Sequence, residues 1–286
     1  MPTKRPKPCP LTAASADRHL LYRHAVQNPE AEVEFASRVY RDLRGRQALH
    51  LREDFAATAE VAAAWVASGK DRTCVGVDLH RPTLRWAEKH VASRLTPDQR
   101  ARLSLVCADV LDLRAGGAPR PDLILALNFS YWVFTDRPTL VRYFRQARAA
   151  LAGRGLLVLD FMGGGDAHLE VSDRTRCWMP RDRRTGIGGP YTYVWEHAMF
   201  DPVSARTTCH IHFEFPDGPP MKRAFTYHWR LWGVAELRDC LVAAGFGRTR
   251  VFWEGEDAKG GGDGVFRERA RGTADRSYVG YFVCER

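Results

Sequence analysis

A strand that turns sharply into a helix is the sequence feature that most constrains this chain. The stretch from Ala48 to Ala59 reads ALHLREDFAATA. After about twenty further residues, a second apolar run, Cys74 to Asp78, ends on an acid, as in folds that hold a nucleoside through its ribose. Such turns usually carry glycine, which permits positive φ and close backbone approach, but this one carries Ala56 and Ala57.

From Gln47 onward, strand and helix signals alternate, which predicts an α/β fold with a mostly parallel sheet covered on both faces. The clearest helix begins after an Asp136 cap with Pro138 in its first turn and stops before Gly153. The expected strands are 48–51, 73–78, 103–107, 122–128 and 155–161, and the expected helices are 58–67, 81–95 and 137–151.

The pattern changes after the fifth strand. Residues 166–190 are polar and rich in Arg and Gly, which predicts a flexible loop, and the strands expected at 191–200, 207–215 and 223–229 are antiparallel. A helix at 234–244, a strand at 249–253, a Gly-rich loop around 260–264 and a strand at 278–284 complete the chain. The predicted organisation is a disordered tip (1–15), N-terminal cap helices (16–46), a cofactor-binding core (47–165), an inserted loop and antiparallel lid (166–232) and the C-terminal part of the core sheet (233–286).

Composition excludes several classes of protein. A chain of 286 residues that is 45% hydrophobic can bury one substantial core. The sequence has no apolar run long enough for a membrane helix and no apolar signal segment at its start, so we expect a cytoplasmic protein, either a monomer or a homodimer. The seven cysteines form no Cys-x-x-Cys pair, which favours reduced core residues over disulfides or zinc. The net charge of +9 is spread along the chain, which makes nucleic-acid binding an unlikely function.

Polar side chains follow several of the expected parallel strands, at the edge where open α/β sheets bind ligands. Asp78 follows the second strand, and a carboxylate there can accept from both hydroxyls of a ribose. Asp109 follows the third strand and suits the exocyclic amine of adenine. Glu53 and Phe55 follow the first strand. Asp78 or Asp109 alone could be an ordinary helix cap, but the order and spacing of these two acids together predict an adenosine site.

At this point the chain resembles the class I S-adenosylmethionine-dependent methyltransferases, and more narrowly a bacterial group whose first motif reads Leu-Arg-Glu-Asp-Phe-Cys-Gly-Thr. The resemblance rests on 26–30, 51–55, 126–131 and 227–232. It implies a Rossmann-like seven-stranded sheet with an antiparallel last strand, and S-adenosyl-L-methionine as the cofactor. The cofactor-binding residues it implies are Arg52, Glu53, Phe55, Ala57, Asp78, Leu79, Asp109, Val110 and Asn128.

The alanines are the departure from the group, which has Cys-Gly where this chain has Ala56-Ala57. A negative φ at Ala57 would make the substitution nearly free of cost, whereas a positive φ would cost about 1 kcal/mol or more. The cofactor has no pyrophosphate to cradle, so the demand on this turn is gentler than in a dinucleotide site.

Methyl transfer is an in-line displacement that depends mainly on positioning, with a base needed only where the acceptor must lose a proton. Asn128 and Tyr131 follow the fourth strand and are expected at the acceptor. The motif that they bound, Asn-Phe-Ser-Tyr, is similar to the Asn-Pro-Pro-Tyr of enzymes that methylate exocyclic amines, but lacks both prolines. His228 or His197 is the expected base, against the alternative of ordinary strand histidines. Acceptor contacts are expected from Tyr22, Tyr131, His197 and Arg230.

A further pattern, His210-x-His212-x-Glu214, places ligand-type side chains on one face of a strand. No third ligand from elsewhere is marked, so the pattern favours the outward polar face of a hairpin, and no metal site is expected. The function expected overall is methyl transfer to a nitrogen or oxygen of a small molecule, because the insertion would enclose the strand ends. The alternatives are a cyclase or lyase acting on the cofactor, a protein or RNA methyltransferase, and a non-catalytic cofactor-binding relative.

Overall fold

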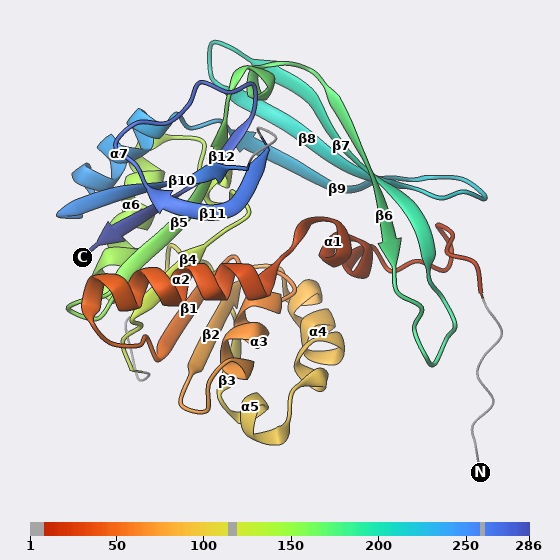
Figure 1. Cartoon of the computed structure of the whole chain (residues 1–286), viewed down its shortest axis with the longest axis horizontal. Helices are drawn as coiled ribbons and strands as arrows, with labels where there is room; N and C mark the ends of the chain where they lie inside the picture. The colour runs from red at the N-terminus through yellow and green to blue at the C-terminus, as the bar shows by residue number, and fades with distance from the viewer. Residues whose placement is uncertain (1–8, 114–118, 258–260) are drawn as a thin grey trace. The chain divides into compact units, whose positions relative to one another are not determined.

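The chain forms two compact units, each described here by itself (Figure 1). The computed structural model describes residues 9–113, 119–257 and 261–286. The core unit consists of Pro29–Gly165 and Trp232–Arg286, and the insert unit of Met1–Asn28 and Asp166–Leu231. Within the described residues, no helix has the length and apolar character needed to cross a membrane.

An eight-stranded sheet organises the core unit, with the order β11-β10-β12-β5-β4-β1-β2-β3. The strands β1 to β5 pair with one another in parallel, whereas β12 runs antiparallel to both β5 and β10. The mostly parallel sheet with an antiparallel last strand is therefore confirmed. The bounds are β1 His50–Asp54, β2 Thr73–Asp78, β3 Leu103–Cys107, β4 Leu123–Ala126, β5 Leu156–Gly163, β10 Arg248–Glu256, β11 Gly262–Glu268 and β12 Tyr278–Glu285.

One strand of this sheet was not expected. β11 pairs antiparallel with β10 and adds an eighth strand where the sequence predicted only a Gly-rich loop; part of that loop, 258–260, lies outside the described residues. Phe266 explains the strand, since its ring packs against Phe35 at 5.9 Å and Tyr281 at 4.7 Å. The contacts of one aromatic side chain with the core therefore outweigh the glycine-rich composition.

Helices lie on both faces of the core sheet, as the alternating pattern predicted. Consecutive residues of β1 show this directly: the Glu53 carboxylate reaches α3, whereas Asp54 accepts from Tyr143 of α6. The helices are α2 Pro29–Arg44, α3 Glu60–Ala67, α4 Arg81–His90, α5 Pro97–Ala101, α6 Arg137–Ala150 and α7 Val234–Ala243. α4 ends earlier than predicted and continues as a 3-10 turn at Ala92–Arg94.

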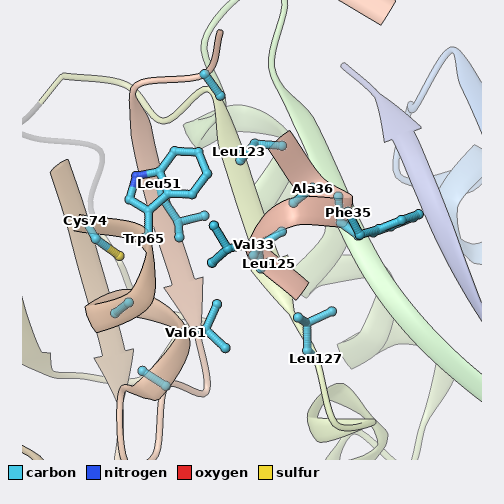
Figure 2. Packing of buried hydrophobic residues seen from close by; sticks show 14 of the residues in the cluster. Val33, Phe35, Ala36, Leu51, Val61, Trp65, Cys74, Leu123, Leu125 and Leu127 are labelled. Atoms are coloured by element: carbon cyan, nitrogen blue, oxygen red, sulfur yellow. The ribbon is translucent and has the colours of Figure 1, made fainter. Parts of the chain in front are cut away.

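The main hydrophobic cluster joins α2 and α3 to the sheet (Figure 2). Val33 of α2, Trp65 of α3, Leu51 of β1 and Leu125 of β4 are each at most 4% exposed. Burying an aliphatic side chain of this size contributes about 1.5 to 3 kcal/mol. This packing fixes the positions of β1 and β4, whose carboxyl ends carry the candidate site.

The insert unit is a four-stranded antiparallel sheet in the order β6-β7-β8-β9, together with α1. Its elements are α1 Arg18–Val26, β6 Ser172–Met179, β7 Gly189–Asp201, β8 Arg206–Glu214 and β9 Met221–Arg230. Leu21 of α1 packs with Tyr191, Ile211 and Phe213 in a separate hydrophobic cluster.

Three expectations about this part of the chain need correction. The segment expected as a flexible loop contains β6, whose polar composition reflects its place as a largely exposed edge strand. Residues 9–15, expected in the disordered tip, include the buried Leu11, and Cys9 forms a bridge with Ile187; residues 1–8 lie outside the described residues. The two N-terminal helices form, but α1 belongs to the insert unit and α2 to the core unit.

Candidate functional site

The turn from β1 to α3 is built from strained backbone. Phe55, Ala57 and Ala59 have φ values of 58°, 45° and 57°. The left-handed region costs a residue with a Cβ about 1 to 2 kcal/mol, and strain of this kind clusters at functional sites. The positive φ at Ala57 is the costly alternative of the two that the sequence left open.

Three hydrogen bonds hold the strained turn in place. Asp78 Oδ2 accepts from the Ala57 N–H at 2.8 Å, and the Val77 carbonyl accepts from the Ala56 N–H at 2.8 Å. Glu53 Oε2 accepts from the Ala62 N–H in the first turn of α3 at 2.9 Å. α3 has no side-chain cap of its own, so Glu53 fulfils that function from the neighbouring strand.

Glu53 is therefore a structural anchor of the turn. Its carboxyl is buried, and burial raises its pKa well above the usual range although the Ala62 N–H favours the charged form. The sequence placed Glu53 among the cofactor-binding residues, and its contact with α3 shows how it shapes the loop that would lie against a ligand.

Gly76 in β2 gives this turn its room. A Cβ built on Gly76 would lie 3.0 Å from Leu105 Cδ2 and 3.2 Å from Ala56 Cβ. The Ala56 methyl group therefore fits in the turn because Gly76 on the adjacent strand has no side chain.

Two acids and an exposed leucine lie next to the turn. Asp78 Oδ1 also accepts from the His80 N–H at 2.7 Å, and each of its oxygens retains a second lone pair for a ligand hydroxyl. Leu79 is 70% exposed, which is unusual for a large apolar side chain and leaves an apolar surface beside the acid. Asp109 Oδ1 accepts from the Leu111 N–H at 2.8 Å, and Val110 between them is buried.

A second strained turn follows β4. Asn128 and Phe129 have φ values of 56° and 53°. Their N–H groups donate to Asp160 Oδ2 at 2.6 Å and Oδ1 at 2.9 Å. Five of the seven described non-glycine residues with positive φ thus lie in the turns after β1 and β4, at the carboxyl edge of the sheet. This concentration of strain marks the edge as the candidate site.

Sequence reasoning missed Asp160, although an acid within the apolar run of β5 was a visible signal. Burial raises the pKa of Asp160 to about 7, against the effect of the two N–H donors. Its carboxylate positions Asn128, so the β4 turn depends on an acid from the next strand.

Tyr131 does not have the environment expected of a residue that lines an acceptor site. Its side chain is fully buried, its hydroxyl donates to the Asp160 carbonyl at 2.7 Å, and burial raises its pKa well above the usual range. These contacts argue against the catalytic and acceptor roles that the sequence suggested. The tyrosine instead fixes the 3-10 turn Ser130–Val133 against β5.

Arg52 also differs from its expected role. Its guanidinium forms a buried ion pair with Asp54, with Nε to Oδ1 at 2.8 Å and Nη2 to Oδ2 at 2.9 Å. The Tyr143 hydroxyl donates to Asp54 Oδ2 at 2.9 Å. The side chain of Arg52 is therefore committed to a buried network on the α6 side of the sheet.

The remaining expected residues lie in the insert unit, where register separates the two candidate bases. His197 pairs with Cys209, which pairs with Tyr227, so these share one face; His228 follows Tyr227 and lies on the other. His197 is buried, its Nδ1 has no partner in the described chain, and burial lowers its pKa. His228 is exposed, with Nδ1 3.2 Å from Thr208 Oγ1. Only one of them can serve as a base at a single acceptor.

Tyr22 and Arg230 are the other expected acceptor contacts. Tyr22 of α1 packs its ring 5.2 Å from that of Phe225 in β9. Arg230 is half-buried at the end of β9.

The two histidines of the His-x-His pattern in β8 form hydrogen bonds within the insert sheet. His212 Nε2 lies 2.8 Å from Glu196 Oε2 and its Nδ1 accepts from the Arg223 N–H, while His210 Nδ1 lies 2.9 Å from Thr226 Oγ1. No group of three or more potential metal ligands occurs within the described ranges. These histidines stabilise the polar face of the insert sheet.

A last carboxyl, that of Glu32, was missed by the sequence reasoning. Glu32 lies in the first turn of α2, and its Oε2 is buried without a hydrogen bond to any described residue. Burial, with the charges of Asp160 and Glu30, raises its pKa to about 8. Glu32 also raises the pKa of Glu53, so these acids form one electrostatic cluster near the strand ends.

No protein-family model matches the chain, and no curated protein matches it. Solved structures do. SAM-bound CalS10, an amino pentose methyltransferase from Micromonospora echinaspora, superposes with a TM-score of 0.65 at 15% identity, covering 94% of this chain and 95% of that one. DesVI from Streptomyces venezuelae gives 0.65 at 17% identity, with 93% and 95% covered. The sugar N-methyltransferase KedS8 from a Streptoalloteichus species gives 0.61 at 20% identity, with 95% and 93% covered. The chain therefore has the Rossmann-like fold of these proteins over nearly its whole length.

Proposed function

We propose that the chain is an S-adenosylmethionine-dependent methyltransferase that acts on a small molecule. The observation that carries the proposal is the strained β1 turn tied to Asp78, with the exposed Leu79 beside it. Methyltransferases that share its fold, including the SAM-bound CalS10, support the choice of cofactor.

The described residues fit an adenosyl ligand. Asp78 retains lone pairs for the ribose hydroxyls, Leu79 offers an apolar surface to the adenine, and Asp109 is placed after the next strand for the exocyclic amine. The positive φ of Ala57 brings the turn's backbone toward the ligand without a glycine. When bound, the cofactor supplies a methyl group activated by its sulfonium.

The chain's own residues contribute mainly position. The Asn128 backbone is locked by Asp160, which would fix that turn beside the transferring methyl. Of the two histidines, we favour His197 as the base, since burial keeps it neutral and its Nδ1 has no partner in the described chain. We retain Tyr22 and Arg230 as acceptor contacts and withdraw Tyr131.

We propose an amine as the acceptor, because KedS8 is described as a sugar N-methyltransferase and CalS10 as an amino pentose methyltransferase. A neutral histidine suits this acceptor, since an amine must lose a proton at some point in the reaction. A hydroxyl acceptor is the second candidate for the same site.

Two measurements test the proposal. S-adenosylmethionine or S-adenosylhomocysteine at a hundredfold excess over its dissociation constant should stabilise the protein by about 2.7 kcal/mol, whereas NAD should not. Mass spectrometry of reactions with a panel of amino sugars and their hydroxyl analogues should then show a gain of one methylene group in an amine. Absence of any thermal shift at millimolar cofactor would contradict the proposal; binding with the cofactor cyclised or cleaved and no acceptor modified would replace methylation with lyase chemistry.

A further inference from the structure

The buried carboxyl of Glu32 lacks, within the described residues, part of the hydrogen bonding that buried polar groups usually have. Its Oε2 is buried and lacks a hydrogen-bond partner among the described residues. Burying a polar group without a hydrogen bond is unfavourable, and more so when the group is charged. The chemical complement of such an oxygen is a cationic N–H donor.

The charged groups that raise the pKa of Glu32 are acids. Asp160 of β5 and Glu30 of α2 both raise its pKa, which reaches about 8, and Glu32 in turn acts on Glu53 of β1 and Tyr281 of β12. The two charged groups that raise the pKa of Glu32 within the described ranges, Asp160 and Glu30, are thus both acids. These acids disfavour one another's charged forms, and a positively charged ligand would favour the charged form of Glu32.

This cluster lies at the same strand ends as the candidate site. Asp160 holds the turn after β4, and Glu53 holds the turn after β1. A cation at Glu32 would therefore lie within electrostatic range of the two acids that hold the strained turns of the proposed cofactor site.

We propose that Glu32 is the residue that binds the amino group of the cofactor's methionine part, accepting a hydrogen bond from its ammonium. The inference rests on the proposed function and adds a residue to it. The cofactor carries two positive charges, and the ammonium is the better match because it brings N–H donors, whereas the sulfonium has none. The product S-adenosylhomocysteine keeps the ammonium and loses the sulfonium, so the two can be told apart.

Titration calorimetry with three ligands tests the assignment. S-adenosylmethionine and S-adenosylhomocysteine both carry the ammonium, and 5′-methylthioadenosine lacks the amino-acid part. Glu32→Gln should weaken the first two alike, by about 10- to 100-fold, and leave the third unchanged. Glu34→Gln, an exposed position two residues along the same helix, is the control and should change none of them.

A second readout uses the wild-type protein. Near pH 7 Glu32 holds a proton in the free protein, and pairing with the ammonium would release that proton to the buffer. Calorimetry in buffers of different ionisation enthalpy should show release of close to one proton, which Glu32→Gln should abolish. A structural role alone would change stability without changing proton release.

The outcomes are separable. Weakening of S-adenosylmethionine alone would assign Glu32 to the sulfonium and overturn the proposal, as would unchanged affinity for both charged ligands. If the wild-type protein binds neither charged ligand, the proposed function fails first. If it binds both and Glu32→Gln has no effect, only this inference fails.

Discussion

Asp78 accepts a hydrogen bond from the Ala57 N–H at 2.8 Å, and this contact joins the acid after β2 to the strained turn after β1. The same carboxylate therefore shapes the loop and, in the proposed function, contacts the ribose. Removing the whole side chain would mix the two effects, so an isosteric substitution is more informative than alanine.

Ala57→Gly should show whether the strain is real. Glycine removes the left-handed penalty of about 1 to 2 kcal/mol and adds an entropic cost of about 0.5 to 1 kcal/mol. We expect the free energy of unfolding to rise by up to about 1.5 kcal/mol, measured by urea titration. The control, Ala64→Gly inside α3, should lower it by about 1 kcal/mol. A similar loss in both variants would show that Ala57 is unstrained.

Gly76→Ala should destabilise the protein by about 1 to 3 kcal/mol, because its Cβ would press on Leu105 and Ala56. Gly233→Ala is the matched control: its φ is −65° and a Cβ there meets nothing within 4 Å. Thermal unfolding compares the two. Equal stability of both variants would mean that β2 does not limit the turn.

Tyr131→Phe removes a buried hydroxyl that donates to the Asp160 carbonyl. We expect a loss of about 0.5 to 1.5 kcal/mol in stability. The rate of acceptor methylation, measured below the melting temperature, should not change. A large drop in kcat with unchanged stability would restore the catalytic role suggested by the sequence.

Stability should fall as the pH rises through the range in which Asp160 and Glu32 lose their protons. Both have pKa values raised in the folded state, to about 7 and about 8, so their favourable contribution is complete below their unfolded values and is lost above the folded ones. Glu32→Gln should therefore be more stable than the wild type at pH 9, with a difference that shrinks toward pH 5. A constant difference across this range, measured by urea titration, would contradict the shifted pKa of Glu32.

The parallel core was predictable because apolar strands alternate with capped helices, as Asp136 and Pro138 show at α6. β6 and β11 were not, because an exposed edge strand such as β6 has the composition of a loop and β11 depends on the tertiary contacts of Phe266. The acids after β2 and β3 were visible from their spacing. Asp160 was visible as an acid within an apolar run, but its role and that of Glu32 were not predictable, because both depend on burial and on neighbours distant in the chain.

The most direct test of the proposed site is the dissociation constant of S-adenosylhomocysteine for the wild type, Asp78→Asn and Asp71→Asn, measured by titration calorimetry. Asp71 is exposed just before β2, at the opposite end of the strand from Asp78. We predict measurable binding by the wild type, unchanged binding by Asp71→Asn, and a loss of about 10- to 100-fold in Asp78→Asn. Equal affinity in all three folded proteins would contradict the assignment of the β1 turn and Asp78 as the cofactor site.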